Sequence, residues 1–273
     1  MILITGASSG IGEATARAFA KAGARLVLVS EQEEQLPAVA QSLCEAGGQA
    51  AAIVADFSKP EQVEGLIARA EQVMGPLEVL VNNAGVGLGA SVLDTKPSDL
   101  RFLFEVNFFA LASLCRQALA VMAPRGQGRI INVSSAAGRL GGTTIGAYAA
   151  TKGAVHAYTH ALRMEARAYG VHVSEVLPIS VRTRFFQNVK GEKYRPSGIV
   201  LTSEQVADSI VRCAAARHPK AEVLPYRPIR AVFVLDALFP GLLDRFAAKE
   251  FAEAVRRPPT PDPSPQEQGE GRE

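Results

Sequence analysis

The chain contains no tryptophan and only three cysteines and four histidines among its 273 residues. Cys44, Cys115 and Cys213 are odd in number and far apart, with neither a Cys-x-x-Cys pair nor a histidine at metal-ligand spacing. This pattern fits neither a disulfide framework nor a metal centre. We therefore expect reduced thiols and no bound metal.

The chain also lacks an excess of one charge and a long hydrophobic run. Its formal net charge is +2 and no basic stripe is interleaved with aromatic residues, so nucleic acid is not an expected partner. No run of 18 apolar residues occurs, and residues 1–4 lack the basic and apolar regions of a signal peptide. We expect no transmembrane segment and a cytoplasmic location.

What the chain does have is enough apolar residues, 48%, for one large core. Short apolar runs that read as buried strands alternate with helical patterns, which is typical of a single α/β domain. The expected strands are 2–4, 24–29, 50–55, 77–81, 129–133, 171–177 and 222–224. The expected long helices cover about 97–122 and 147–169, and Thr202 to Gln205 has the form of a capping box that opens a further helix.

The first strand leads through a glycine-rich stretch, 5–12, into a helical pattern at 13–22. Strand, glycine turn and helix is the order that a dinucleotide-binding loop requires: Gly6 allows a sharp turn, Gly10 lets the backbone approach a pyrophosphate, and Gly12 lets the helix pack on the strand. The alternative is a purely structural turn. The loop residues expected to contact a cofactor are Gly6, Ser8, Ser9, Gly10, Ile11 and Gly12.

Two further strand ends carry polar residues. Asp56 follows the third strand, where it can accept a hydrogen bond from an adenine amino group or cap the helix that starts near Pro60. The fourth strand ends in Asn82, Asn83, Ala84 and Gly85. These amides can tie the loop to neighbouring strands and bring the backbone of Asn83, Ala84 and Gly85 close to a ribose, although an ordinary Asn-Gly type of turn is the alternative.

Residues 134–152 are where chemistry best explains the choice of residues. On a helix, Tyr148 and Lys152 lie one turn apart on one face, so the ammonium favours the phenolate and brings the phenol pKa down from about 10 toward working pH. Tyr148 then becomes a general acid/base. Ser135 follows a buried strand and can orient a substrate oxygen at the same sheet edge. Without such a site, Tyr148 would be an ordinary helix tyrosine and Lys152 a solvated charge.

In this order the motifs closely resemble those of the short-chain dehydrogenase/reductase family, over roughly residues 1–226. The resemblance implies a doubly wound Rossmann-type fold with a seven-stranded, mostly parallel sheet and helices on both faces. It also implies a nicotinamide cofactor and a catalytic tetrad of Asn107, Ser135, Tyr148 and Lys152. In the family, Asn107 would hold a proton-relaying water, and Lys152 and Tyr148 would also contact the nicotinamide ribose.

The chain departs from the family after the sixth strand. Pro178 is followed by Ile179, where the family usually has glycine, and a β-branched residue disfavours a positive φ. The resemblance implies cofactor contacts for Pro178, Val181 and Thr183, with a nicotinamide-side loop whose path can differ here.

The cofactor preference depends on Glu31, at the end of the second strand. Neither Glu31 nor Ser9 is basic, and a carboxylate repels a 2′-phosphate but accepts a hydrogen bond from a free 2′-hydroxyl. We therefore expect NAD rather than NADP. The alternative is that Glu31 points into solvent.

We expect residues 1–226 to form the catalytic domain, with a substrate lid at about 184–200. Residues 227–257 form an apolar helical extension, and 258–273 form a disordered tail. Within the extension, segment 229–246 makes core or subunit contacts, attaches peripherally to a membrane, or forms the mouth for a lipophilic substrate. The long helices suggest a homodimer or homotetramer. The expected function is interconversion of a small-molecule secondary alcohol and ketone, or alcohol and aldehyde, and the alternative is a non-catalytic nucleotide sensor or scaffold.

Overall fold

The computed structural model describes residues 1–183, 185, 190–191 and 198–256. Most of the lid expected at 184–200 and all of the tail expected at 258–273 lie outside the described residues.

The centre of the fold is a seven-stranded sheet in which every pair of neighbouring strands is parallel. In spatial order its strands are β3 (Gln49–Val54), β2 (Arg25–Ser30), β1 (Ile2–Thr5), β4 (Val79–Asn82), β6 (Gly128–Val133), β7 (Val171–Val176) and β9 (Glu222–Val223). The strand order reverses between β1 and β4, so a crevice opens there at the carboxyl ends of the strands. The expected doubly wound fold is confirmed.

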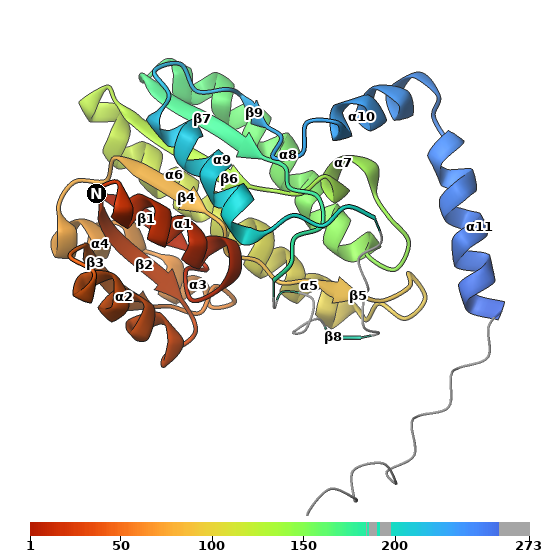
Figure 1. Ribbon diagram of the computed structural model, residues 1–273, viewed down its shortest axis with the longest axis horizontal. Helices are drawn as coiled ribbons and strands as arrows, with labels where there is room; N and C mark the ends of the chain where they lie inside the picture. Colours follow the sequence, from red (N-terminus) through yellow and green to blue (C-terminus); the bar gives the residue numbers. More distant parts are fainter. Residues whose placement is uncertain (184, 186–189, 192–197, 257–273) are drawn as a thin grey trace, which may run out of the picture.

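Helices cover both faces of the sheet because the strands are apolar on both faces. In β2, Leu26 and Leu28 join one core, and Val27 and Val29 join the other. The first core is completed by α1 (Gly10–Lys21), α2 (Gln35–Glu45) and α9 (Ser203–Ala215), and the second by α4 (Leu66–Met74), α6 (Ala110–Met122) and α8 (Gly146–Arg167). Figure 1 shows α1 and α9 on the front of the sheet and α6 and α8 behind it. Thr202 and Gln205 form the expected capping box of α9.

The helix expected over about 97–122 is divided into three parts. A π-helical turn, η1 (Glu105–Phe109), separates α5 (Pro97–Phe104) from α6. The stretch Pro97–Arg125 is long and apolar enough to cross a membrane by length and composition, but half of its most apolar window is buried inside the fold. Because α6 supplies core side chains against the sheet, this stretch is explained as a core helix.

The helix expected to start near Pro60 is the short α3 (Pro60–Val63). Several other short elements were not expected from the sequence. They are the 3-10 turn η2 (Ala123–Arg125), α7 (Ala137–Leu140), and a two-stranded parallel sheet of β5 (Leu88–Gly89) and β8 (Lys190–Gly191).

The C-terminal extension is helical, as expected. It consists of α10 (Ile229–Leu238) and α11 (Leu242–Arg256), and Figure 1 shows α11 standing away from the body. Phe233 is buried under the guanidinium of Arg139, which lies 4.3 Å from its ring centroid. Large apolar side chains such as Leu238 and Phe246 are exposed. The extension is therefore attached through α10, and most of its apolar surface is not used for the core.

Candidate active site

The glycine-rich loop between β1 and α1 is shaped by close backbone approaches. Gly6 has a φ of +63°, and a Cβ on it would lie 2.9 Å from the Cα of Ala84. A Cβ on Gly12 would lie 2.1 Å from the carbonyl oxygen of Gly6. Neither position has room for a side chain, so the loop stays close to the strand ends and directs the N-terminus of α1 toward the crevice.

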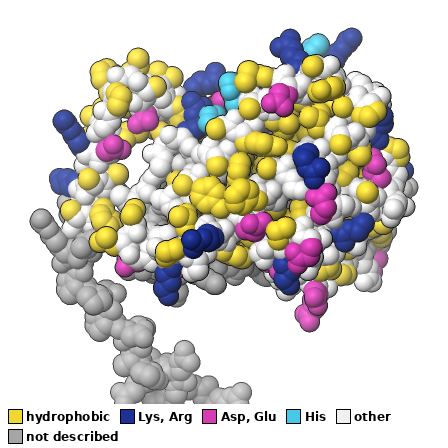
Figure 2. Space-filling view, turned by 180° about the vertical axis from the view of Figure 1, so that it is seen from behind, with side chains coloured by type: hydrophobic (Ala, Val, Ile, Leu, Met, Phe, Trp, Pro, Cys, Tyr) yellow, Lys and Arg dark blue, Asp and Glu magenta, His cyan; other side chains and the backbone are white. Residues whose placement is uncertain are grey.

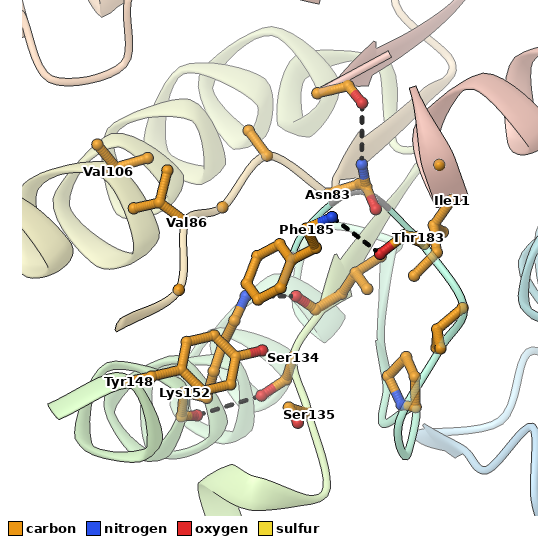
Figure 3. A pocket seen from close by; sticks show the side chains of 18 of the residues that line it. Ile11, Asn83, Val86, Val106, Ser134, Ser135, Tyr148, Lys152, Thr183 and Phe185 are labelled. Atoms are coloured by element: carbon orange, nitrogen blue, oxygen red, sulfur yellow. Dashed lines mark hydrogen bonds between the residues drawn. The ribbon is translucent and has the colours of Figure 1, made fainter. Parts of the chain in front are cut away.

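A cavity of about 800 Å³ lies along this crevice. Figure 3 shows Tyr148, Lys152, Ser134 and Ser135 together on one side of it and Ile11, Asn83 and Thr183 on the other. Fifteen of the residues expected from the sequence line the cavity: Gly6, Ser8, Ser9, Gly10, Ile11, Glu31, Asn83, Ala84, Gly85, Ser135, Tyr148, Lys152, Pro178, Val181 and Thr183. Gly12, Asp56 and Asn107 are not among the lining residues.

Asp56 is engaged in its own turn. One carboxylate oxygen accepts hydrogen bonds from the backbone N–H of Ser58 at 2.8 Å and from its hydroxyl at 2.7 Å, and the other lies 3.6 Å from the ammonium of Lys59. Burial acts to raise the pKa of Asp56, but the hydrogen bonds from Ser58 and the charge of Lys59 together outweigh it and lower that pKa. The N-cap of α3 is Lys59, not Asp56, and Phe57 lines the cavity instead. An adenine contact for Asp56 stays a prediction.

The paired asparagines tie the end of β4 to its neighbours, as the sequence suggested. The amide of Asn83 donates to the carbonyl of Thr5 at 3.0 Å, and the Thr5 hydroxyl accepts from the backbone N–H groups of Asn83 and Ala84, each at 2.9 Å. Asn82 donates to the side chain of Asn132 on β6 at 2.9 Å. The loop that passes the cavity is thus held from β1 and β6.

Asn107 lies behind the cavity wall, in the π-helical turn, and is completely buried. Its Oδ1 accepts from the N–H of Val86 at 2.8 Å, and its Nδ2 donates to the Val86 carbonyl at 2.9 Å and to the Thr151 hydroxyl at 3.0 Å. These three hydrogen bonds, two to Val86 and one to Thr151, satisfy the buried amide. Asn107 therefore joins the β4 loop to α8 next to Lys152.

Lys152 is almost completely buried. Its Nζ donates to the carbonyl of Val133 at 3.1 Å and lies 5.9 Å from the centroid of the Tyr148 ring. Its own carbonyl accepts from the Ser134 hydroxyl at 3.1 Å. Burial lowers the pKa of Lys152 to about 8, while the negative charge of Glu175 acts in the raising direction. The ammonium is therefore held beside the phenol in a site where its proton can be lost near working pH.

Two neighbouring serines have different surroundings. Both line the cavity, but Ser134 is buried and its hydroxyl is bound to the backbone of α8, whereas Ser135 is half-buried, with its Oγ accepting from the N–H of Ala137 at 3.1 Å. The hydroxyl of Ser135 still has a proton to donate toward the cavity. The expected role of Ser135 in orienting a substrate oxygen stays a prediction.

The loop that carries Ile179 still reaches the cavity. Ile179 has no positive φ, and the Pro178 carbonyl accepts from the N–H of Ala136 at 2.9 Å. The Thr183 side chain lies 3.2 Å from where a Cβ on Gly10 would be, and its hydroxyl accepts from the N–H of Phe185. Isoleucine in place of the family glycine thus does not keep Thr183 away from the glycine loop.

The sequence did not indicate which apolar residues line the cavity. The lining includes Phe102, Leu103, Val106, Leu140, Ile145 and Phe185. Phe185 packs edge-on against Tyr148, with ring centroids 5.6 Å apart. An apolar stripe on a helix indicates a buried face but not whether the face meets core or cavity, so periodicity alone could not distinguish these residues.

Comparison with known proteins gives consistent results. The family model of short chain dehydrogenases matches residues 1–193. The ketoacyl reductase HetN of Nostoc sp. is 34% identical over 224 residues, which is 82% of this chain and 77% of that protein. A short chain dehydrogenase/reductase of Burkholderia phymatum, solved with NAD, superposes with a TM-score of 0.77 at 28% identity and 96% coverage of both chains. A metagenomic short-chain oxidoreductase, solved with NADP, has a TM-score of 0.71 at 31% identity and covers 82% of this chain and 96% of its own.

Proposed function

The chain belongs to the short-chain dehydrogenase/reductase family of NAD(P)-dependent oxidoreductases, and we propose that it interconverts a secondary alcohol and a ketone, or an alcohol and an aldehyde, with Tyr148 as general acid/base. The observation that carries the proposal is the grouping of Tyr148, Lys152 and Ser135 on one wall of the cavity that the glycine loop borders. HetN, a relative at 34% identity, is named a ketoacyl reductase, which is carbonyl chemistry of this kind.

The cavity suits a dinucleotide on its own geometry. Backbone packs so closely at Gly6 and Gly12 that a Cβ cannot be accommodated, and the N-terminus of α1 opens beside them, which favours a pyrophosphate. When bound, the nicotinamide supplies or accepts the hydride. The residues around it do the remaining work.

Each residue of the tetrad has a separate task in this proposal. Tyr148 removes the hydroxyl proton of an alcohol or returns one to a carbonyl oxygen. Ser135 donates a hydrogen bond to the same oxygen, and the Lys152 ammonium, close to the Tyr148 ring, favours the phenolate. Asn107 acts through the backbone of Val86 and through Thr151, so it shapes the pocket behind Lys152.

The apolar residues in the cavity lining support substrates that carry an apolar group next to the reacting carbon. Such a group would be buried by Phe102, Leu103, Val106, Leu140 and Ile145. We propose NAD as the preferred cofactor because Glu31 lines the cavity at the end of β2, where a carboxylate disfavours a 2′-phosphate.

We also propose that the protein is a homo-oligomer. Figure 2 shows hydrophobic side chains gathered on the face of the molecule opposite to that of Figure 1, which α6 and α8 cover. Phe109, the last residue of η1 directly before α6, is 52% exposed, and Met164 on α8 is also exposed. A large apolar surface on a helical face is typical of a subunit contact.

A screen of carbonyl compounds and alcohols with both cofactors tests the proposed activity. We expect oxidation or reduction of at least one apolar substrate, followed at 340 nm. Cofactor binding without turnover across a broad panel would instead support a nucleotide-sensing protein on the same fold.

A further inference from the structure

Glu175 is a carboxylate inside the protein, with no exposed surface. It lies on β7, whose residues Val171 and Val173 pack in the core beneath α8, and strand alternation directs Glu175 to the same face. One oxygen accepts a hydrogen bond from His156 Nδ1 at 2.7 Å, and the other is buried without a hydrogen-bond partner among the described residues. Burying a carboxylate lowers the stability of the fold, and here only one of its two oxygens has a hydrogen-bond partner. We therefore look for a functional role of Glu175 rather than a stabilising one.

The position of Glu175 connects it to the active-site lysine. His156 follows Lys152 by one turn on α8, so the two side chains leave the same face of the helix. Glu175 is the register partner of Asn132 on β6, and the next residue, Val133, provides the carbonyl to which Lys152 Nζ donates. The carboxylate of Glu175 and the ammonium of Lys152 therefore lie in the same buried region between α8 and the sheet, where both are shielded from water.

Resting on the function proposed above, we propose that Glu175, held in place by His156, is a positioning residue that keeps the buried Lys152 ammonium charged next to Tyr148. Lys152 needs its charge to favour the phenolate, yet burial favours loss of its proton. A negative charge in the same dry region opposes that loss. In water the same carboxylate would be screened and would have little effect at this separation.

The other charged side chains near Lys152 do not provide the same buried negative charge as Glu175. Glu222 on β9 pairs with Arg139 on α7 at 3.2 Å, and each side chain is about one-third exposed. Arg163, further along α8, donates to the carbonyls of Val173 and Ala221. Glu175 is thus the fully buried carboxylate of this group, and its charge is the one that no arginine in the described part of the chain neutralises directly.

The direction of the effect follows from the Lys152 pKa. Burial lowers that pKa to about 8, and Glu175 already opposes the shift. With the carboxylate neutralised, the pKa of Lys152 falls further, and the ammonium is lost closer to neutral pH.

Titration of Lys152 by NMR in Glu175→Gln tests this without any need for turnover. Lysine labelled with carbon-13 at Cε is incorporated into the full-length protein, and the Lys152 signal is assigned by its absence in Lys152→Arg. We expect the Lys152 titration midpoint to move by about one pH unit toward acid in Glu175→Gln. We expect Glu175→Asp to keep most of the original midpoint because it keeps the charge. An unchanged midpoint in a folded Glu175→Gln protein overturns the proposal, whatever substrate the enzyme uses.

Glu222→Gln is the matched control, since it removes a carboxylate from the same cluster at a more exposed position. We expect it to move the Lys152 midpoint much less than Glu175→Gln does, and an equal shift would contradict the specific role of Glu175. If Glu175→Gln does not fold, His156→Gln is measured instead. This variant keeps the charge of Glu175 but removes the hydrogen bond that holds its carboxylate, so we expect a smaller shift of the Lys152 midpoint toward acid. No shift in that case counts against the proposal.

Kinetics give a second readout once a substrate is known. The fall in kcat on the alkaline side should begin about one pH unit lower in Glu175→Gln, with activity restored by lowering the pH.

A bound metal ion is a second possible source of charge beside Lys152. Ligand atoms of His156, Glu175 and Glu222 lie within 4.8 Å of one another, a spacing that a divalent cation can use. If zinc ions bind the parent protein tightly and EDTA moves the Lys152 midpoint, a metal and not the bare carboxylate sets the charge, and the proposal is overturned.

Discussion

A Cβ on Gly138 would lie 2.6 Å from the carbonyl carbon of Lys152 and 2.7 Å from its oxygen. The short helix α7 therefore packs directly on the backbone of α8 at the active-site lysine. Gly138→Ala must push the two helices apart, and we expect about 1 to 3 kcal/mol lower stability and at least tenfold lower kcat/KM. Gly146→Ala, at the start of α8, is the control, because the one neighbouring atom described within 4 Å of its Cβ would be a Val92 methyl at 3.8 Å, and alanine favours the helix. Equal stability and activity of Gly138→Ala would show that this contact is not needed.

Removal of the Tyr148 hydroxyl should abolish most of the turnover without loss of the fold. In Tyr148→Phe we expect kcat to fall about 100- to 10,000-fold while the dissociation constant of the cofactor stays within a few fold. Tyr158→Phe, on the same helix, removes a hydroxyl that donates to the Ala112 carbonyl at 3.4 Å and lies outside the cavity lining. It should keep its activity. Near-normal turnover of a folded Tyr148→Phe protein would exclude the acid/base role.

We expect the burial of Lys152 to lower the free energy of unfolding at neutral pH, because an ammonium needed next to Tyr148 is removed from water. Its folded-state pKa is about 8, whereas an unfolded lysine titrates near 10.4, so the unfolded chain binds more protons between these values and stability from this group rises with pH there. Below pH 8 both states are protonated and the full cost of burying the ammonium is present. We expect Lys152→Met to be about 1 to 3 kcal/mol more stable than the parent at pH 7, with the gap narrowing at pH 9 to 10, and to lose at least 100-fold in kcat. Denaturant unfolding at both pH values measures the gap, and a destabilised Lys152→Met would contradict it.

Glu31 should make the protein prefer NADH over NADPH. Direct binding measurements on the parent should give a lower dissociation constant for NADH, and Glu31→Arg should bring the two constants closer or reverse them, because an arginine can pair with the 2′-phosphate. Glu34→Arg makes the same change of charge at an exposed residue outside the cavity lining and should leave the preference unchanged. Tighter binding of NADPH by the parent would refute the assignment.

A charge on the apolar face should weaken the proposed oligomer. Light scattering of the parent at micromolar concentration should give a mass of two or four chains, and Phe109→Asp should shift it toward one chain because a carboxylate cannot be buried without a partner. Leu93→Asp changes a side chain that is 97% exposed in a loop and should not alter the mass. A parent protein that is monomeric at this concentration would contradict the proposal.

The elements that could be predicted from the amino-acid sequence are those with a local cause. The apolar runs from 2–4 to 222–224 correspond to the seven strands within a few residues, because a buried parallel strand must be apolar on both faces. The glycine loop was predictable because only glycine fits where backbones touch, and Tyr148 and Lys152 because a spacing of four residues on a helix puts two side chains on one face. The alternation of strand and helix then led to the carboxyl edge of the sheet as the site.

Residues that contribute to the site through contacts between distant parts of the chain could be identified only from the tertiary structure. Asp56 lies outside the cavity lining and is held by Ser58 and Lys59, contacts that the sequence did not indicate. Phe102 and Val106 follow a helical period that does not distinguish a core from a cavity, and nothing in the local sequence shows that Glu175 is buried behind Lys152. The spacing of residues along the sequence shows which face of a helix or strand a side chain is on. Whether that side chain is buried, interacts with a distant charge or lines the cavity depends on the element that packs against this face. That element is known only once the helices have packed on the sheet.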